Sequence, residues 1–154
     1  MKDYILGVDL GGTNIKAAAY RLESYEKVGE KRLPTQVEGG WEHVLGRVLA
    51  ALEELLRQTP RERVLCVGMG VPGLLDIEAG VSRFSPNFPQ WEDVPVAAWL
   101  EERLLGPARR VVESHALAIS RAGCEIVTAQ LGDAAGMLGA AVYGARRMGE
   151  GARM

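Results

Sequence analysis

The first twenty residues constrain the fold most, because two apolar runs flank a short glycine-containing turn. The run over residues 4–8 ends in Asp9, the segment Gly11–Thr13 follows, and a second apolar run covers residues 15–20. Runs rich in β-forming residues on both sides of a glycine pair are typical of a β-hairpin. The sequence therefore predicts a sheet built around a hairpin over residues 4–20.

The predicted turn has the composition of an anion-binding loop. Gly11 and Gly12 lack a Cβ, so successive backbone N–H groups can point into one concavity where phosphate oxygens approach the chain. Thr13 adds a hydroxyl donor, and Asp9 is placed to hold a metal-bound water. These features predict a nucleotide phosphate with Mg²⁺. The Walker pattern is absent from the sequence. An ordinary hairpin turn with an exposed aspartate is the alternative.

The next hundred residues alternate strand-like and helix-like patterns. Residues 25–35 predict an exposed or edge strand, because charged residues dominate it before Pro34. Residues 63–70 form an apolar run without polar alternation, which is typical of a strand covered on both faces, with Cys66 as a small core residue. Between them, apolar residues at three- and four-residue spacing predict an amphipathic helix: Trp41, Val44, Leu45, Val48, Leu49, Leu52, Leu55 and Leu56.

Residues 68–73 formally satisfy the dinucleotide pattern G-x-G-x-x-G, but they include Pro72 and no helical stripe begins after them. A dinucleotide site requires that helix, so this segment is interpreted as a glycine-rich strand exit. Residues 81–91 predict a loop fixed by two prolines, in which Trp91 packs. Asn87 in this loop is either a turn residue or a ligand for a polyol, to which an amide offers both a donor and an acceptor.

A second amphipathic helix is predicted over residues 94–105, ended by Gly106 and Pro107, and a strand over residues 109–113. A strand, helix, strand succession indicates a mixed α/β sheet. The length of 154 residues fits one domain.

Composition excludes several classes of function. The net charge of −2 gives no basic surface for nucleic acid, and the two cysteines have no zinc-site or disulfide spacing. The longest late apolar stretch is short and rich in glycine, so no membrane span is expected, and no signal segment precedes the first strand. We therefore expect a cytoplasmic protein without zinc, nucleic acid or membrane partners.

The segment V-D-L-G-G-T-N-I-K over residues 8–16 resembles the phosphate-binding loop of the sugar kinase, Hsp70 and actin superfamily. The segments G-V-P-G over residues 70–73 and P-N-F-P-Q-W over residues 86–91 extend the resemblance to the ROK family of sugar kinases and sugar-responsive repressors. The resemblance implies a ribonuclease H-like lobe, a mixed sheet with flanking helices, that takes ATP, Mg²⁺ and a hexose or amino sugar. By the same resemblance the phosphate-binding residues are Asp9, Gly11, Gly12, Thr13 and Lys16, with Asp9 also reaching Mg²⁺ through water, and the sugar-binding residues are Gly73 and Asn87.

The sequence departs from the family where the catalytic base is expected. Those kinases read V-E-N-D-A-N-A, and their aspartate takes the proton from the attacking sugar hydroxyl; here residues 112–118 read V-E-S-H-A-L-A. His115 thus occupies the position of the aspartate. An imidazole fills different space and is cationic when protonated, which makes His115 a doubtful base and predicts impaired phosphoryl transfer.

The second departure is the large domain of the family, whose glycine-rich turns, sugar-contacting residues and zinc segment are not found. Residues 122–146 instead resemble the family's final strand and C-terminal helix. We expect one lobe formed by residues 1–113, completed by residues 122–148, with an apparent deletion junction near 114–121. A non-catalytic sugar- or phosphate-binding lobe, an interaction lobe or a truncated remnant is the alternative. Homo-oligomers would cover exposed surface, and a repressor is disfavoured because no helix-turn-helix precedes the first strand.

Overall fold

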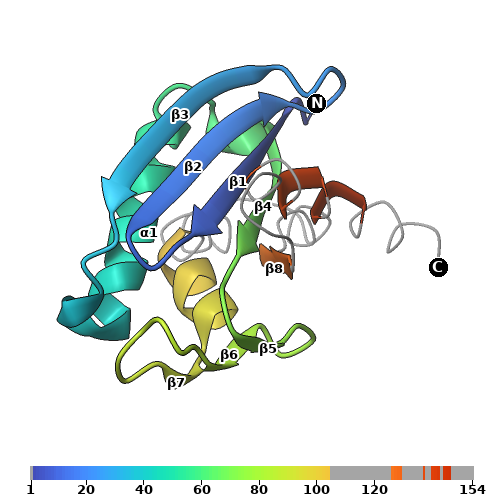
Figure 1. The fold of residues 1–154 in the computed structure, drawn as a ribbon. Coiled ribbons are helices and arrows are strands. Elements are labelled where there is room, and N and C mark those ends of the chain that lie inside the picture. The colour runs from blue at the N-terminus through green and yellow to red at the C-terminus, as the bar shows by residue number, and fades with distance from the viewer. Residues whose placement is uncertain (1, 105–125, 130–136, 138–139, 143, 147–154) are drawn as a thin grey trace.

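The computed structural model describes residues 2–104, 126–129, 137, 140–142 and 144–146. Among these residues the main sheet has the strand order β3-β2-β1-β4-β8, as Figure 1 shows. β1, β2 and β3 pair antiparallel, whereas β4 lies parallel to β1 and β8 lies parallel to β4. The bounds are β1 Tyr4–Leu10, β2 Asn14–Arg21, β3 Lys27–Pro34, β4 Val64–Gly70 and β8 Ile126–Ala129.

The predicted hairpin is confirmed: β1 and β2 pair from Tyr4 with Arg21 to Leu10 with Ile15, and the turn lies over residues 11–13. The predicted edge strand is confirmed as β3, which stands at one end of the strand order. The paired residues of β1 and β2 are mostly apolar, and this explains why the hairpin lies in the interior of the protein. Its strands supply side chains to the cores on both faces of the sheet.

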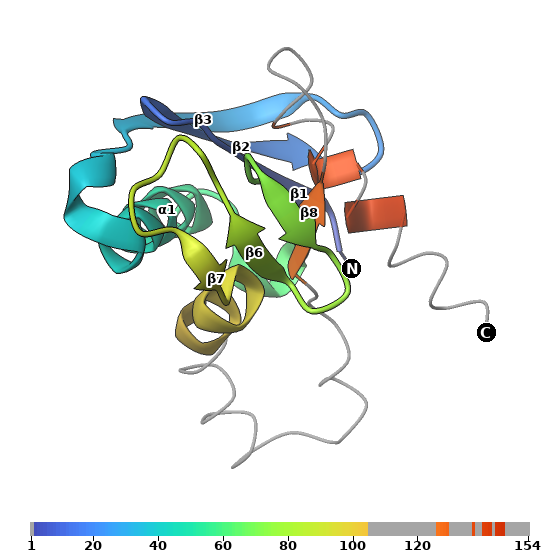
Figure 2. The same cartoon turned by 60° about the horizontal axis from the view of Figure 1, so that its bottom comes forward.

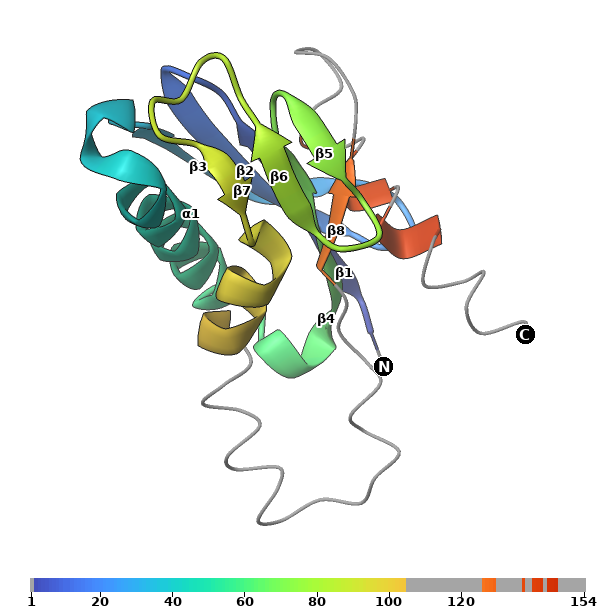
Figure 3. The ribbon, with the colours of Figure 1, turned by 90° about the horizontal axis from the view of Figure 1, so that it is seen from below.

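Helix α1, Gly40–Leu56, covers one face of the sheet and follows a short 3₁₀ turn, Val37–Gly39. The predicted apolar stripe of α1 faces the main core, where Val44, Leu45 and Leu52 are fully buried. A second 3₁₀ turn, Arg61–Arg63, leads into β4. The helix over residues 96–104 lies beside α1 in Figures 2 and 3, and its residues join the same core.

The opposite face of the sheet carries a smaller core with Cys66, whose predicted burial is confirmed. Helical residues between 137 and 146 pack there, against glycines on the two central strands. A Cβ added to Gly7 would lie 1.8 Å from the carbonyl oxygen of Met137, and one added to Gly68 would lie 1.8 Å from that of Ala140. The chain therefore approaches the sheet backbone to backbone, which only glycine permits.

A small second sheet corrects the predicted loop over residues 81–91 at its start, where residues 81–84 form a strand, whereas residues 85–91 are a loop as predicted. It has the order β5-β6-β7, with β5 Leu74–Asp76, β6 Val81–Phe84 and β7 Glu92–Val94. Strands of three or four residues carry too little alternation to be recognised from sequence. The second helix accordingly begins at residue 96 and not at 94, because Val94 pairs with Ser82 in the sheet.

The remaining predictions on the C-terminal part fall only in part on described residues. The predicted final strand has a counterpart in β8, and the predicted C-terminal helix is helical where it is described. The predicted strand over residues 109–113, the junction at 114–121 and Cys124 lie outside the described residues. None of the described helices combines the length and apolar character needed to cross a membrane.

Candidate functional site

The β1–β2 turn is held in one conformation by a residue that the sequence did not single out. Within the turn, the backbone N–H of Gly11 donates to the carbonyl of Asn14 at 3.0 Å. Thr35, directly after β3, donates its hydroxyl to the carbonyl of Gly11 at 2.6 Å and its backbone N–H to the carbonyl of Thr13 at 2.9 Å. Thr35 therefore donates a hydrogen bond to the carbonyl of each residue that flanks Gly12 in the sequence.

Thr35 is fully buried, so the donor side of both bonds is shielded from solvent. Each of the two carbonyls bonded to Thr35 is directed toward that residue, which favours anion binding through the N–H groups of the turn. The sequence indicated this role only weakly, because Thr35 is simply a threonine that follows a strand-ending proline. Its role became visible only from the register, which pairs Asn14 with Pro34 and so places Thr35 beside the turn.

Asp9 and Lys16 face each other across the hairpin. They are register partners on β1 and β2, and the Lys16 Nζ lies 3.8 Å from a carboxylate oxygen of Asp9. The Asp9 side chain is 18% exposed and that of Lys16 is 36% exposed, so both charges remain accessible at the end of the hairpin. The structure thus brings together the predicted carboxylate and the predicted lysine.

The carboxylate of Asp9 suits a magnesium ion that a nucleotide brings with it. Among the described residues no group of three or more His, Cys, Asp or Glu is placed to hold a metal. Mg²⁺ retains several waters and commonly binds one or two carboxylates together with substrate phosphates. One partly exposed aspartate beside the turn predicted to bind phosphate fits that requirement.

The predicted sugar residue Asn87 lies next to the turn. A Cβ added to Gly12 would stand 3.5 Å from the Cβ of Asn87, in ordinary van der Waals contact. Asn87 is exposed. Figure 3 shows the loop between β6 and β7 beside the end of the hairpin. Two segments 75 positions apart in sequence therefore meet at one place.

Two buried aromatic residues support the loop that carries Asn87. Phe88 and Trp91 are buried, with ring centroids 4.7 Å apart, and this confirms the prediction that Trp91 packs. The backbone N–H of Phe88 donates to the carbonyl of Ser85 at 3.2 Å, which closes a turn around Asn87. The asparagine is thus presented to solvent on a fixed turn.

The structure explains why position 73 is a glycine, which the sequence did not reveal. The φ of Gly73 is +107°, and a Cβ there would lie 2.1 Å from the carbonyl oxygen of Phe84. Glycine is required at this position for the close packing of β5 on β6. His115, the candidate base, lies outside the described residues.

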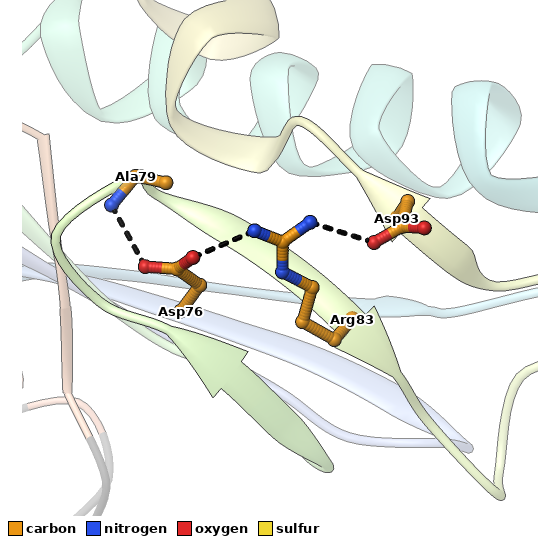
Figure 4. A network of polar contacts seen from close by, with 4 residues as sticks. All are labelled: Asp76, Ala79, Arg83 and Asp93. Atoms are coloured by element: carbon orange, nitrogen blue, oxygen red, sulfur yellow. Dashed lines mark hydrogen bonds and ion pairs between the residues drawn. The ribbon is translucent and has the colours of Figure 1, made fainter.

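A charged network ties the three short strands together at the base of the Asn87 loop (Figure 4). Arg83 on β6 donates to Asp76 on β5 at 2.7 Å and to Asp93 on β7 at 2.8 Å, and Asp76 also accepts the backbone N–H of Ala79 at 3.1 Å. Asp93 has a positive φ of 49°, an uncommon conformation for a non-glycine residue. The guanidinium thus joins the strand before the loop to the strand after it.

This network predicts a defined pH response. Hydrogen bonds from Arg83, and then from Ala79, hold the pKa of Asp76 below its ordinary value. A lowered folded-state pKa gives stability that is complete above the ordinary aspartate pKa of about 4 and lost as pH falls through the lowered value. We expect Arg83→Gln to raise the pKa of Asp76 toward the ordinary value, measured by NMR titration of the carboxyl carbon.

The matched control is Arg103→Gln, which removes an arginine of similar exposure from the helix over residues 96–104. It should leave the pKa of Asp76 where it is. An Asp76 pKa that ignores Arg83→Gln, or that moves equally in both variants, contradicts the network.

Comparison with protein families matches residues 5–123 to the ROK family. The chain is 38% identical over 99 residues to a glucokinase of Thermotoga maritima, a match that covers 64% of this chain and 30% of that protein. It is 29% identical over 101 residues to a putative xylose repressor of Caldicellulosiruptor sp., covering 64% of this chain and 25% of that protein.

Among solved structures, a ROK hexokinase from Thermus thermophilus matches with a TM-score of 0.61 and 28% identity. That match covers 82% of this chain and 35% of the hexokinase. The chain therefore spans between 25% and 35% of the length of these three proteins.

Proposed function

Because the chain belongs to the ROK family, we propose that it forms a sugar-kinase lobe that binds the phosphates of ATP and a hexose or amino sugar. Its mixed sheet with flanking helices is the ribonuclease H-like α/β lobe found in the ROK kinases. The glucokinase and hexokinase relatives act on sugars, which supports the substrate class.

One observation carries the proposal: the glycine turn and the Asn87 loop meet. Phosphoryl transfer to a sugar requires the phosphate donor and the sugar hydroxyl to lie side by side. The 3.5 Å approach between the Gly12 position and the Asn87 Cβ supplies such a junction. A turn that was only structural would not need an exposed amide beside it.

Each residue at this junction takes a distinct role in the proposal. The N–H groups of Gly12 and Thr13 face the phosphates, and Lys16 neutralises phosphate charge. Gly11 shapes the turn at the phosphates, because its own N–H is bonded to the carbonyl of Asn14. Asp9 would hold Mg²⁺ through water; the ion supplies charge neutralisation to the phosphate oxygens when bound. The amide of Asn87 hydrogen-bonds sugar hydroxyls, while Gly73 keeps β5 and β6 close beneath the loop.

Proton removal from the sugar is the weak step. In the kinase pattern an aspartate takes that proton, and this chain has His115 at the corresponding position. We therefore propose that binding is retained and that phosphoryl transfer is impaired. The apparent junction at residues 114–121, between a lobe of residues 1–113 and the completing segment 122–148, belongs to the same proposal.

The first test is the Mg²⁺ dependence of ATP binding to the full chain, measured by isothermal titration calorimetry. We expect Mg²⁺ to strengthen ATP binding, and Asp9→Asn to abolish that strengthening, a change of about tenfold for the loss of a charged partner. Asp76→Asn is the matched control, because Asp76 belongs to the Arg83 network. Equal Mg²⁺ effects in wild type and Asp9→Asn would contradict the assigned role.

Catalysis is tested separately by release of ADP from Mg-ATP in the presence of glucose, mannose or an N-acetyl amino sugar. Sugar-dependent turnover that is lost in His115→Ala would show that imidazole serves as the base and would overturn the proposed impairment. ATP and sugar binding without turnover would support a non-catalytic binding lobe, the alternative function.

A further inference from the structure

A row of charged residues crosses the hairpin and β3 next to the glycine turn. The register pairs Asp9 with Lys16 across β1 and β2, and pairs Lys16 with Arg32 across β2 and β3. Directly paired residues on antiparallel strands have their side chains on the same face. Asp9, Lys16 and Arg32 therefore stand side by side, and the row carries one excess positive charge.

The Lys16–Arg32 pair is unfavourable by itself. Like charges directly opposite each other destabilise a sheet. Lys16 has Asp9 at 3.8 Å, whereas Arg32 is exposed and pairs with no carboxylate in the described part of the chain. An anionic ligand would remove this cost.

The position of the row identifies the kind of anion. Lys16 lies two residues after Asn14, where the turn ends, which is about 7 Å along a strand. A chain of linked phosphates is long enough to reach from the N–H groups of the turn to the row. The planar guanidinium of arginine binds phosphate oxygens in a bidentate manner.

We propose that Arg32 is a phosphate-binding residue that acts with Lys16 on the polyphosphate of the nucleotide. The inference rests on the proposed function and adds to it a cation on β3, outside the motif that the resemblance covers. The helical residues near the C-terminus pack over Gly7 and Gly68, one row further along the same face. The charged row lies between that packing and the turn.

The neighbouring residue Lys31 offers a matched control. Lys31 pairs with Ala17, a residue of the main core, so it lies on the opposite face, the one covered by α1. Lys31→Gln removes the same charge, one position away on the same strand. It tests whether the face matters or only the net charge.

We expect Arg32→Gln to weaken binding of Mg-ATP about tenfold, the usual loss for a charged hydrogen bond. Inorganic tripolyphosphate should show the same loss, because the contact is to phosphate. Lys31→Gln should bind within about twofold of wild type, and Arg32→Lys should lose less than Arg32→Gln because it keeps the charge. Calorimetric titrations at one ionic strength give all four comparisons.

The outcomes separate this inference from the proposed function. If wild type binds Mg-ATP and Asp9→Asn changes the Mg²⁺ effect, but Arg32→Gln binds as wild type does, only the role of Arg32 is wrong. Equal weakening of Mg-ATP binding in Lys31→Gln and Arg32→Gln would likewise overturn it. In that case the loss of one positive charge would explain both results, whichever face of the sheet carries the charge. A wild-type chain that binds neither ATP nor tripolyphosphate overturns the inference together with the proposed function.

Discussion

Gly68→Ala should destabilise the protein by about 3 kcal/mol, near the upper end of the usual cost of overpacking a core. The new methyl group would lie 1.8 Å from the carbonyl oxygen and 2.2 Å from the carbonyl carbon of Ala140. These are backbone atoms, so no side-chain rotation relieves the clash. Either β4 shifts within the sheet or the helical residues move away and expose Cys66 and its neighbours. Urea unfolding followed by circular dichroism gives the free energy of unfolding.

Gly46→Ala is the control for Gly68→Ala. Gly46 lies inside α1, and nothing stands within 4 Å of a Cβ added there. Alanine is favoured over glycine within a helix by about 1 kcal/mol, so this variant should be more stable than wild type. Equal stability of Gly68→Ala and wild type would show that the close packing on β4 does not persist in solution.

Thr35→Val should lower the free energy of unfolding by about 1–3 kcal/mol, the range for leaving a buried hydrogen-bonding group without its partner. Valine has nearly the shape of threonine but lacks the hydroxyl that binds the carbonyl of Gly11 at 2.6 Å. Because that carbonyl then becomes a free acceptor in the turn, we also expect binding of Mg-ATP to weaken. Unfolding and calorimetric binding are measured on the same preparations.

Two further variants separate turn geometry from general stability. Thr35→Ser keeps a hydroxyl and should restore ATP binding. Thr59→Val removes a comparable buried bond, from the Thr59 hydroxyl to the carbonyl of Leu55 at 2.9 Å, at the far end of α1. It should cost stability but leave ATP binding unchanged. A Thr35→Val variant that binds ATP as wild type does would show that the turn does not depend on this hydroxyl.

The sequence predicted those parts of the fold whose pattern repeats over enough residues. The hairpin over residues 4–20 and the stripe of α1 each carry many apolar positions at one period. β5, β6 and β7 were missed because each has only three or four residues, and no local pattern indicates which of these short segments pair.

The site could be predicted only in part, because it depends on how the strands pair and on contacts between residues far apart in sequence. The glycine turn was recognisable from its own composition. The approach of Asn87 to Gly12 depends on tertiary structure across 75 positions, and only the family resemblance pointed to it. Thr35 and Arg32 owe their places to the pairing of β2 with β3, which a single sequence does not specify.

The glycine-lined face of the sheet also bears on synthesis of the chain. Met137, Ala140 and Ala141 cover Gly7 and Gly68, although both strands that carry these glycines are translated long before them. A nascent chain that has only reached residue 104 therefore carries a finished hairpin and α1 but one bare sheet face. Contacts so distant in sequence slow folding, and unpaired apolar surface favours association during the delay. Closure of this face is thus a late step in folding, in which helical residues distant in sequence cover a sheet begun by the first ten residues.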